Sequence, residues 1–279
     1  MPIHDQSYRR YAGAREQLGN AWLVIAGSGI RGIIRKRRFL GLLLFAWMPF
    51  FVRAIQIYLA ANFPTMSMLA ATAETFREFL EQQGLFVFLI TVWVGAGLIA
   101  NDKRVNALQI YLSKPLTRIE YVAGKLAILA VFLLLVTWVP AMLLLLLQML
   151  FAGSFAFVRA NLFLFPAITV FSLLQVLLAS FTMLALSSLT KSSRYVGILY
   201  AGAVFFTDAV YGVVYSVTDN SSLSWMSFPA NLRQLGDVVF RLRPRYETPW
   251  IVSLMVVAAL IGVSMLVLER RVRGVEVVA

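Results

Sequence analysis

Six long apolar blocks, almost free of charged residues, run through the chain and constrain its fold more than any other feature. At a rise of 1.5 Å per residue, a helix of about 20 residues crosses the ~30 Å hydrocarbon core of a bilayer. With six such spans in 279 residues, little chain remains for a folded domain outside the membrane. The sequence therefore predicts an all-α polytopic membrane protein with six transmembrane helices, at residues 39–60, 84–100, 121–151, 162–189, 195–217 and 249–268.

Basic residues are distributed unevenly between the two sides that these spans define. Residues 1–38 form a basic tail, within which residues 8–29 are expected to form an interfacial helix on the inner leaflet. With this tail inside, the predicted cytoplasmic segments hold 18 of the Lys and Arg residues and the external segments hold six. The positive-inside rule then places both termini in the cytoplasm, including a tail at 269–279. We expect a multi-pass protein of the plasma (inner) membrane.

Two of the three connections that are expected to lie outside have a distinct character. Residues 62–83 carry Glu74, Glu78 and Glu81 on one helical flank, which indicates an acidic, solvated segment. Residues 218–248 have apolar residues at helix-like spacing, which indicates a short external or re-entrant helical cap. The four arginines of this second connection are the one feature that argues against the topology.

Several classes of chemistry lack the residues that they need. The chain has no cysteine, and its single histidine is His4 in the polar N-terminal tail, so disulfide, zinc and histidine-based catalytic sites are not expected. The phosphate-binding motif Gly-x-x-x-x-Gly-Lys-Ser/Thr does not occur either, so the chain is not expected to be an enzyme or to bind nucleotide itself. The formal charge of +12 fits anionic lipid headgroups better than a nucleic-acid partner.

The most informative segment lies between the second and third spans. Val105, Leu108 and Tyr111 recur at helical spacing and form one apolar stripe about two turns long. A short amphipathic helix over about 102–112 is therefore expected.

A firm corner is expected to follow this helix. Pro115 disfavours helix in the residue before it, and the spacing of Thr117 and Glu120 is that of a capping box at the start of the third span. Such an elbow suits an element that transmits force from a cytoplasmic partner.

A run of about 25 residues in this segment has a recognisable pattern: Asp102-Lys103-Arg104, Leu112-Ser113-Lys114-Pro115-Leu116-Thr117-Arg118, Tyr121 and Gly124-Lys125. In these residues the segment resembles the cytoplasmic loop of ABC-2-type permeases, the membrane subunits of ATP-driven ABC transporters. The layout also resembles that family: six spans, both ends inside, an interfacial N-terminal helix and a helical segment between the last two spans.

The resemblance implies partners and a coupling site. It implies a permease homodimer, or a heterodimer with a sister permease, docked on two ATP-binding subunits that bind the ATP and Mg; no cofactor is expected in this chain. In that family the loop acts as a coupling helix seated in a cleft of the ATPase. Carried onto this sequence, the helix covers about 102–112 from Asp102, with Val105, Leu108 and Tyr111 as buried residues and Lys103, Arg104, Lys114 and Arg118 as rim charges. The alternative is that these basic residues contact lipid headgroups.

Two charged residues lie within predicted spans. Arg53 and Asp208 are at similar depths, about 20 Å from the cytoplasmic ends of the first and fifth spans. An unpaired charge at such a depth costs a few kcal/mol. We predict that they form an ion pair or that both line a polar translocation route; the alternative is that each snorkels towards the external interface.

The leading functional hypothesis is the permease subunit of an ATP-driven exporter. The scarcity of charges in the spans favours an amphipathic or lipid-like substrate over a small ion. A second hypothesis is a non-transporting scaffold or mechanotransmitter, in which the elbow moves an external partner through residues 218–248. A secondary transporter or an intramembrane enzyme is disfavoured, because the repeats and coupling residues that such proteins need are not visible.

Overall fold

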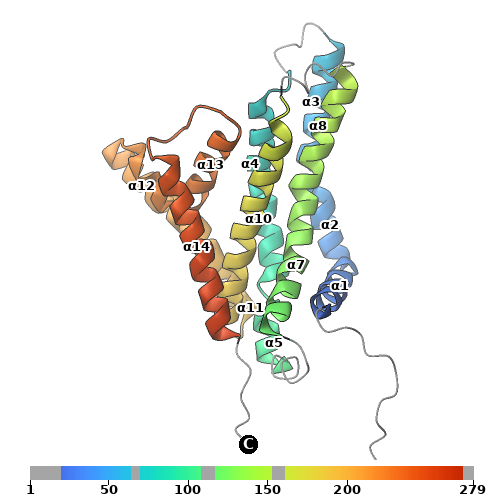
Figure 1. Ribbon diagram of the computed structural model, residues 1–279, viewed down its shortest axis with the longest axis vertical. Helices are drawn as coiled ribbons and strands as arrows, with labels where there is room; N and C mark the ends of the chain where they lie inside the picture. Colours follow the sequence, from blue (N-terminus) through green and yellow to red (C-terminus); the bar gives the residue numbers. More distant parts are fainter. Residues whose placement is uncertain (1–19, 64–69, 108–116, 153–160, 273–279) are drawn as a thin grey trace, which may run out of the picture.

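The computed structural model describes residues 20–63, 70–107, 117–152 and 161–272, which form helices and turns with no strand among them. Six helices in these ranges are long and apolar enough to cross a membrane, which confirms the six-helix architecture. They cover Arg37–Asn62, Ala73–Arg104, Arg118–Phe151, Leu164–Leu189, Ser193–Thr218 and Trp250–Arg271. Figure 1 shows them as a bundle elongated along the helix axes.

The first and third spans are each divided by a break next to a proline. The divided helices are α2 (Arg37–Ala46) with α3 (Met48–Asn62), and α7 (Arg118–Val136) with α8 (Trp138–Ala152). Pro49 lies in the first turn of α3 and Pro140 in the first turn of α8, where the missing N–H leaves no hydrogen bond unmade. The break between α7 and α8 falls at Thr137, whose hydroxyl donates to Leu133 O at 2.8 Å.

The second and fifth spans each contain a π-helical segment. The second runs through α4 (Ala73–Ile90), η2 (Thr91–Gly95) and α5 (Ala100–Arg104). The fifth runs through α11 (Ser193–Ala201), η3 (Gly202–Phe206) and α12 (Thr207–Thr218). By contrast, α10 (Leu164–Leu189) and α14 (Trp250–Arg271) are continuous helices. A π segment inserts an extra residue into a turn and re-aims the neighbouring side chains, and such segments are frequent at functional sites.

The connection between the last two spans is helical, as its sequence pattern predicts. It contains the 3-10 helix η4 (Ser221–Met226) and the amphipathic helix α13 (Phe228–Val239). The side chain of Ser227 caps α13 by accepting a hydrogen bond from Ala230 N at 3.1 Å. The acidic connection differs from expectation: Glu74, Glu78 and Glu81 all lie on α4, which runs without interruption into the second span.

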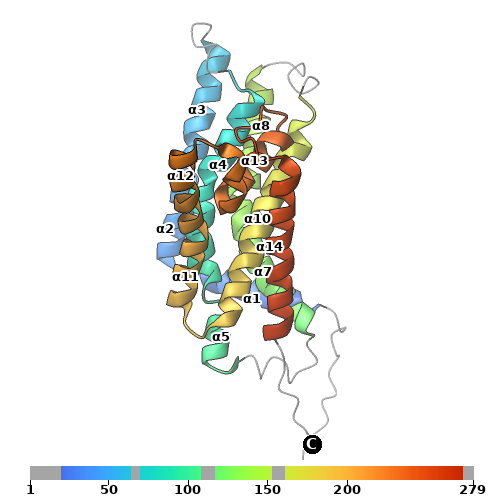
Figure 2. The same cartoon turned by 90° about the vertical axis from the view of Figure 1, so that its left-hand side faces the viewer.

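Helix α1 (Ala21–Ile34) packs against α7 at the end of the bundle that also carries α5. It runs across the other helices: Figure 1 shows it nearly end-on, and Figure 2 shows it lying crosswise. Its close approach requires Gly124, because a Cβ there would lie 2.8 Å from Ile25 Cβ and 3.0 Å from Trp22 O. The orientation fits an interfacial helix, which remains a prediction, and the helix begins at Ala21, later than expected.

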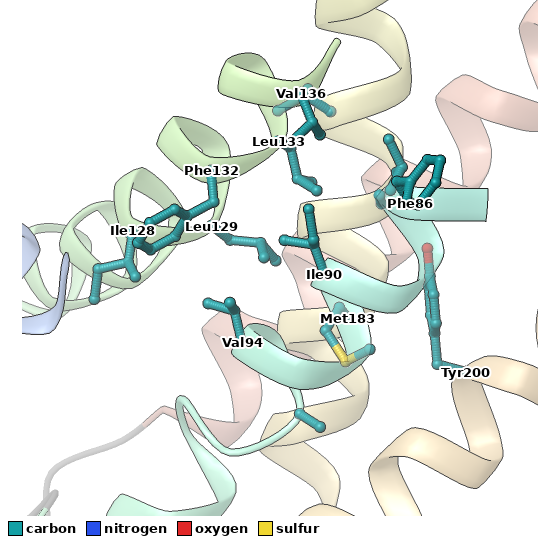
Figure 3. Packing of buried hydrophobic residues seen from close by; sticks show 14 of the residues in the cluster. Phe86, Ile90, Val94, Ile128, Leu129, Phe132, Leu133, Val136, Met183 and Tyr200 are labelled. Atoms are coloured by element: carbon teal, nitrogen blue, oxygen red, sulfur yellow. The ribbon is translucent and has the colours of Figure 1, made fainter. Parts of the chain in front are cut away.

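The largest core joins α4, η2, α7 and α10 in the middle of the bundle (Figure 3). Phe132 packs edge-on against Phe39 of α2, with ring centroids 4.9 Å apart. At Gly95 a Cβ would approach Met183 Cγ to 2.4 Å, so the side chain of Met183 on α10 packs directly against the backbone of η2. Small residues at such crossings let membrane helices pack closely.

Candidate functional site

The α5 end of the bundle is tied together by buried and half-buried polar contacts. Asp102 on α5 accepts a hydrogen bond from Tyr121 Oη at 2.7 Å and forms an ion pair with Lys125 Nζ at 2.7 Å. Both partners lie on α7, so this carboxylate joins the second span to the third. Lys103 Nζ donates to the main-chain oxygen of Ser188 on α10, which joins the same short helix to the fourth span.

Ser187 provides the hydrogen bonds that the backbone of the second span lacks where its helix is interrupted. Between η2 and α5 the chain leaves regular helix, and the fully buried Ser187 hydroxyl accepts from Ile99 N at 3.2 Å and from Ala100 N at 3.0 Å. The same hydroxyl donates to Ala96 O at 2.9 Å. One side chain of α10 therefore satisfies three backbone groups at the point where α5 begins.

The helix predicted over about 102–112 is helical at 102–104 but is interrupted at Val105 and Asn106. Helix α5 ends at Arg104, Val105 follows as its C-cap, and Asn106 takes a left-handed conformation with φ 54°. Asparagine tolerates the left-handed conformation because its short polar side chain can form local hydrogen bonds. Asn106 therefore ends the helix, although the apolar pattern of the sequence continues beyond it. Val105 is 64% exposed, as an apolar contact residue without its partner would be. Leu108, Tyr111, Lys114 and Pro115 lie outside the described residues.

The start of the third span has the cap that its sequence indicates. Thr117 Oγ1 accepts from Glu120 N at 3.2 Å, and Glu120 Oε2 accepts from Thr117 N at 2.9 Å. Arg118, the first residue of α7, and Arg104 at the end of α5 are both exposed at this end of the bundle. Their roles as rim charges remain a prediction.

Arg53 and Asp208 do not pair with each other, which corrects the predicted ion pair. Arg53 Nη2 contacts Glu78 Oε2 at 3.0 Å, and its Nη1 donates to Gln56 at 2.9 Å. Asp208 Oδ1 accepts from Ser227 Oγ at 2.7 Å and lies 3.6 Å from Arg233 Nη1. The prediction failed because it treated the glutamates of 62–83 as solvated, whereas α4 carries them alongside the spans.

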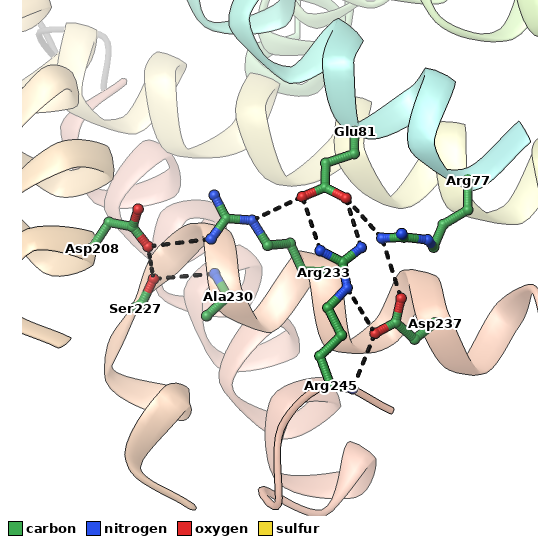
Figure 4. A network of polar contacts seen from close by, with 8 residues as sticks. All are labelled: Arg77, Glu81, Asp208, Ser227, Ala230, Arg233, Asp237 and Arg245. Carbon is green, nitrogen blue, oxygen red and sulfur yellow. Dashed lines mark hydrogen bonds and ion pairs between the residues drawn. The ribbon is translucent and has the colours of Figure 1, made fainter. Parts of the chain in front are cut away.

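Three arginines and three acids form one network at the α13 end, which we call the arginine network (Figure 4). Glu81 is its centre: it contacts Arg77 at 2.7 Å, Arg233 at 3.2 Å and Arg245 at 2.7 Å. Asp237 contacts Arg77 and Arg245, each at 3.3 Å. Asp208 joins the network through Arg233. Its six members are Arg77, Glu81, Asp208, Arg233, Asp237 and Arg245.

The arginine network fastens α13 to the transmembrane helices. Its members come from α4, α12, α13 and the segment before α14, so the helical cap is held to two spans at once. Burial raises the pKa of Asp237 to about 6, opposed by the neighbouring Arg77 guanidinium. The equal number of arginines and acids leaves the network formally neutral when all six are charged.

A cavity of about 260 Å³ lies beside this network, bounded by α4, α10, α11, η3, α12 and α13. Most of its wall is apolar and aromatic. Arg77, Glu81, Asp208 and Arg233 of the arginine network contribute to its lining. Gln175 of α10 also lines it, is 6% exposed, and has an Oε1 without a hydrogen-bond partner in the described ranges. This oxygen therefore makes no interhelical hydrogen bond within the described part of the chain.

Several residues that build these sites gave little signal in the sequence. Ser187 is one of many serines in an apolar block, and nothing in the sequence marks it as a partner of Ile99 or Ala100. The arginines after residue 230 were noticeable, but only the fold brings them to Glu81. Within the described part of the chain, no group of three or more His, Asp or Glu side chains is placed to hold a metal ion.

Comparison with known proteins identifies one family. The model of the ABC-2 family transporter protein matches residues 23–271, which is nearly the whole chain. No curated protein matches the sequence.

Proposed function

The chain belongs to the ABC-2 family of transporter proteins, and we propose that it is the permease subunit of an ATP-driven exporter for an amphipathic or lipid-like substrate. Proteins of this family are membrane components of transporters and are not themselves catalytic, and they associate with ATP-binding ABC subunits. Two copies of such a subunit would bind the ATP and Mg, and a second copy of this chain, or a sister permease, would complete the membrane part. The plasma (inner) membrane is the proposed location.

The bracing of α5 is the observation that carries this proposal. A force applied to this short helix reaches α7 through Asp102 and reaches α10 through Lys103 and Ser187. These contacts make α5 a firm lever, which a connection that only joined two spans would not need. The exposed Val105 at its tip offers an apolar contact to a partner subunit.

The proposed cycle follows from this connection. Closure of the ATP-binding subunits on nucleotide would displace α5, and the second, third and fourth spans would move with it. Helices α4 and α10 both line the cavity at the other end of the bundle, so the displacement reaches the place where a substrate could lie. The mostly apolar lining of that cavity supports an amphipathic substrate.

The first test is the composition of the complex, with one substitution at α5. The chain is purified from its own host through a tag, in mild detergent, and the native mass is measured. We expect a particle with two permeases and two ATP-binding subunits, and we expect Val105→Asp to reduce recovery of the ATP-binding subunit at least tenfold. Val217→Asp is the matched control, because it places the same charge at an exposed valine near the end of α12. A particle without a nucleotide-binding partner, or full recovery with Val105→Asp, would refute the proposal.

The arginine network supports a second candidate function, that of a scaffold or mechanotransmitter. A scaffold that moves an external partner needs a cap that follows the spans, and three arginines fasten α13 to α4 and α12. Reconstituted vesicles separate the two candidates: ATP-dependent movement of an amphiphile across the bilayer supports the exporter. ATP hydrolysis that changes only the accessibility of α13 supports the mechanotransmitter.

A further inference from the structure

We propose that the cavity beside the arginine network binds a cationic amphiphile, that is, an apolar molecule carrying one protonated amine. The inference rests on the proposed function, since it assigns a charge and a binding site to the substrate of the exporter. Three features of the cavity carry it: an aromatic wall, a buried hydrogen-bond acceptor and the partly exposed, weakly paired carboxylate of Asp208.

Four aromatic rings form one side of the cavity. Phe88 lies at the centre of this wall: it stacks on Tyr200 with centroids 5.7 Å apart and meets Phe205 edge-on at 4.8 Å. Phe228 of α13 continues the wall, with its ring 6.4 Å from that of Tyr200. All four residues line the cavity. The faces of aromatic rings attract an ammonium group, and more strongly where water is excluded.

Gln175 supplies a hydrogen-bond acceptor that the protein leaves unused. Its side chain is more than nine-tenths buried, and Oε1 has no hydrogen-bond partner among the residues that the structure describes. A buried carbonyl oxygen without a donor costs free energy, and a ligand that brings an N–H recovers it. An ammonium group offers three such donors, whereas a carboxylate or a sulfate offers none.

The charges around the cavity favour a cation over an anion. Arg77 is engaged by both Glu81, at 2.7 Å, and Asp237, at 3.3 Å, so an anionic ligand would have to displace a carboxylate to reach it. Asp208 is the least neutralised acid in the lining: its contact with Arg233, at 3.6 Å, is the longest ion pair found in the described ranges. Its carboxylate is 36% exposed and attracts a cation that enters the mouth.

The position of the cavity allows entry from the bilayer. Leu85 and Phe205 line it and are 57% and 54% exposed, and both lie within transmembrane helices. Phe205 belongs to η3, where the π-helical turn changes the direction of the neighbouring side chains. An amphiphile dissolved in the membrane would pass these two apolar side chains, place its body against the aromatic wall and its ammonium group on Gln175.

The test uses three ligands of one shape that differ in charge: 4-phenylbutylamine, 4-phenylbutanol and 4-phenylbutyrate. Binding to the purified transporter complex in lipid nanodiscs is measured by calorimetry without nucleotide. We expect the amine to bind at least tenfold more tightly than the alcohol, and the acid to bind most weakly. Equal affinities, preference for the acid, or no binding of the amine would overturn the proposal without any substitution being made.

Two substitutions then place the ligand in the cavity. Gln175→Leu removes the buried acceptor and is expected to weaken the amine and the alcohol alike, about tenfold, because both donate a hydrogen bond. Asp208→Asn is expected to remove the preference for the amine while leaving the alcohol unchanged. Gln148→Leu on α8 and Asp219→Asn after α12 are the matched controls, and neither residue lines the cavity.

The outcome does not depend on the subunit composition of the complex. An amine affinity that is unchanged in Gln175→Leu, or an amine preference that survives Asp208→Asn, would place the binding site elsewhere and refute the proposal. Calorimetry without nucleotide measures ligand binding in the absence of the ATP-driven cycle, whereas the native mass reports the partners. A complex that contains ATP-binding subunits but does not prefer the amine would therefore refute this inference and leave the proposed function standing.

Discussion

Ser187→Ala should destabilise the protein far more than the loss of one hydroxyl suggests. The Ser187 hydroxyl accepts from Ile99 N and Ala100 N and donates to Ala96 O, all at 3.2 Å or less and all out of contact with solvent. Alanine fits the same space, so the substitution removes three hydrogen bonds with almost no change in packing. The substitution leaves the N–H groups of Ile99 and Ala100 without a hydrogen-bond acceptor and removes one donor from Ala96 O, in a region without water.

The expected magnitude follows from these three bonds. At about 1 kcal/mol for each intramolecular hydrogen bond, the free energy of unfolding falls by about 3 kcal/mol. Side-chain hydrogen bonds between membrane helices average about 0.6 kcal/mol each, which sets a lower value of about 2 kcal/mol. We expect a loss of about 2–3 kcal/mol, and partial uncoupling of ATP hydrolysis from transport, because α5 keeps only its Lys103 contact with α10.

Ser188→Ala is the matched control. Ser188 is adjacent in sequence and equally buried, but its hydroxyl donates only to Ala185 O one turn earlier in the same helix. Its loss leaves no backbone group of another helix without a partner, so we expect a change below about 1 kcal/mol. Both variants are measured by unfolding in dodecyl sulfate from mixed micelles, alongside ATP-driven transport in vesicles. Equal losses of unfolding free energy in the two variants, or a loss below 1 kcal/mol for Ser187→Ala, would refute the role of Ser187 as hydrogen-bond partner of the interrupted second span.

Three further predictions address other contacts. Gly124→Val drives a side chain into Ile25 and should release α1 from α7, which limited proteolysis of the N-terminal region would detect; unchanged cleavage would contradict the close packing. Burial raises the pKa of Asp237 to about 6, above its ordinary value of 3.8, so the folded state binds the proton of this carboxyl more tightly than the unfolded state does. The free energy of unfolding should therefore rise as the pH falls through 6 and level off below about 4, and this pH dependence should vanish in Asp237→Asn. A double-mutant cycle of Arg53→Met and Glu78→Gln should give a coupling of about 1 kcal/mol in unfolding measurements, and a coupling near zero would mean that each side chain is stabilised independently.

The fold was largely predictable because it depends on composition over long windows. A block of some 20 apolar residues has no alternative to a helix in a bilayer, so the six spans follow from hydropathy alone. The capping box at Thr117 and Glu120 was predictable for a different reason, since all of its contacts are local. The end of α5 was missed because one residue, Asn106, overrides an apolar pattern that continues beyond it.

The candidate sites were less predictable because they depend on contacts between distant segments. Arg245 and Glu81 are 164 residues apart in sequence, and Ser187 meets Ala100 across 87 residues. A charge in a span indicates that some partner exists, but depth along two helices does not say which acid faces which base. Arg53 shows this: Glu78, on the neighbouring helix, lies closer than the acid of similar depth.

Three of the four arginines between the fifth and sixth spans have partners in the folded chain. The positive-inside rule counts Lys and Arg in short loops and gives little weight to Asp and Glu, so the orientation of the spans stays a prediction from the 18-to-6 distribution. In the folded chain Arg233 and Arg245 are paired with Glu81, and Arg241 lies over the ring of Phe163 at 4.6 Å. Their retention on the predicted external side is explained by the arginine network and the packing of the cap. The same reasoning makes these arginines the residues whose replacement should loosen α13 while leaving the orientation of the spans unchanged.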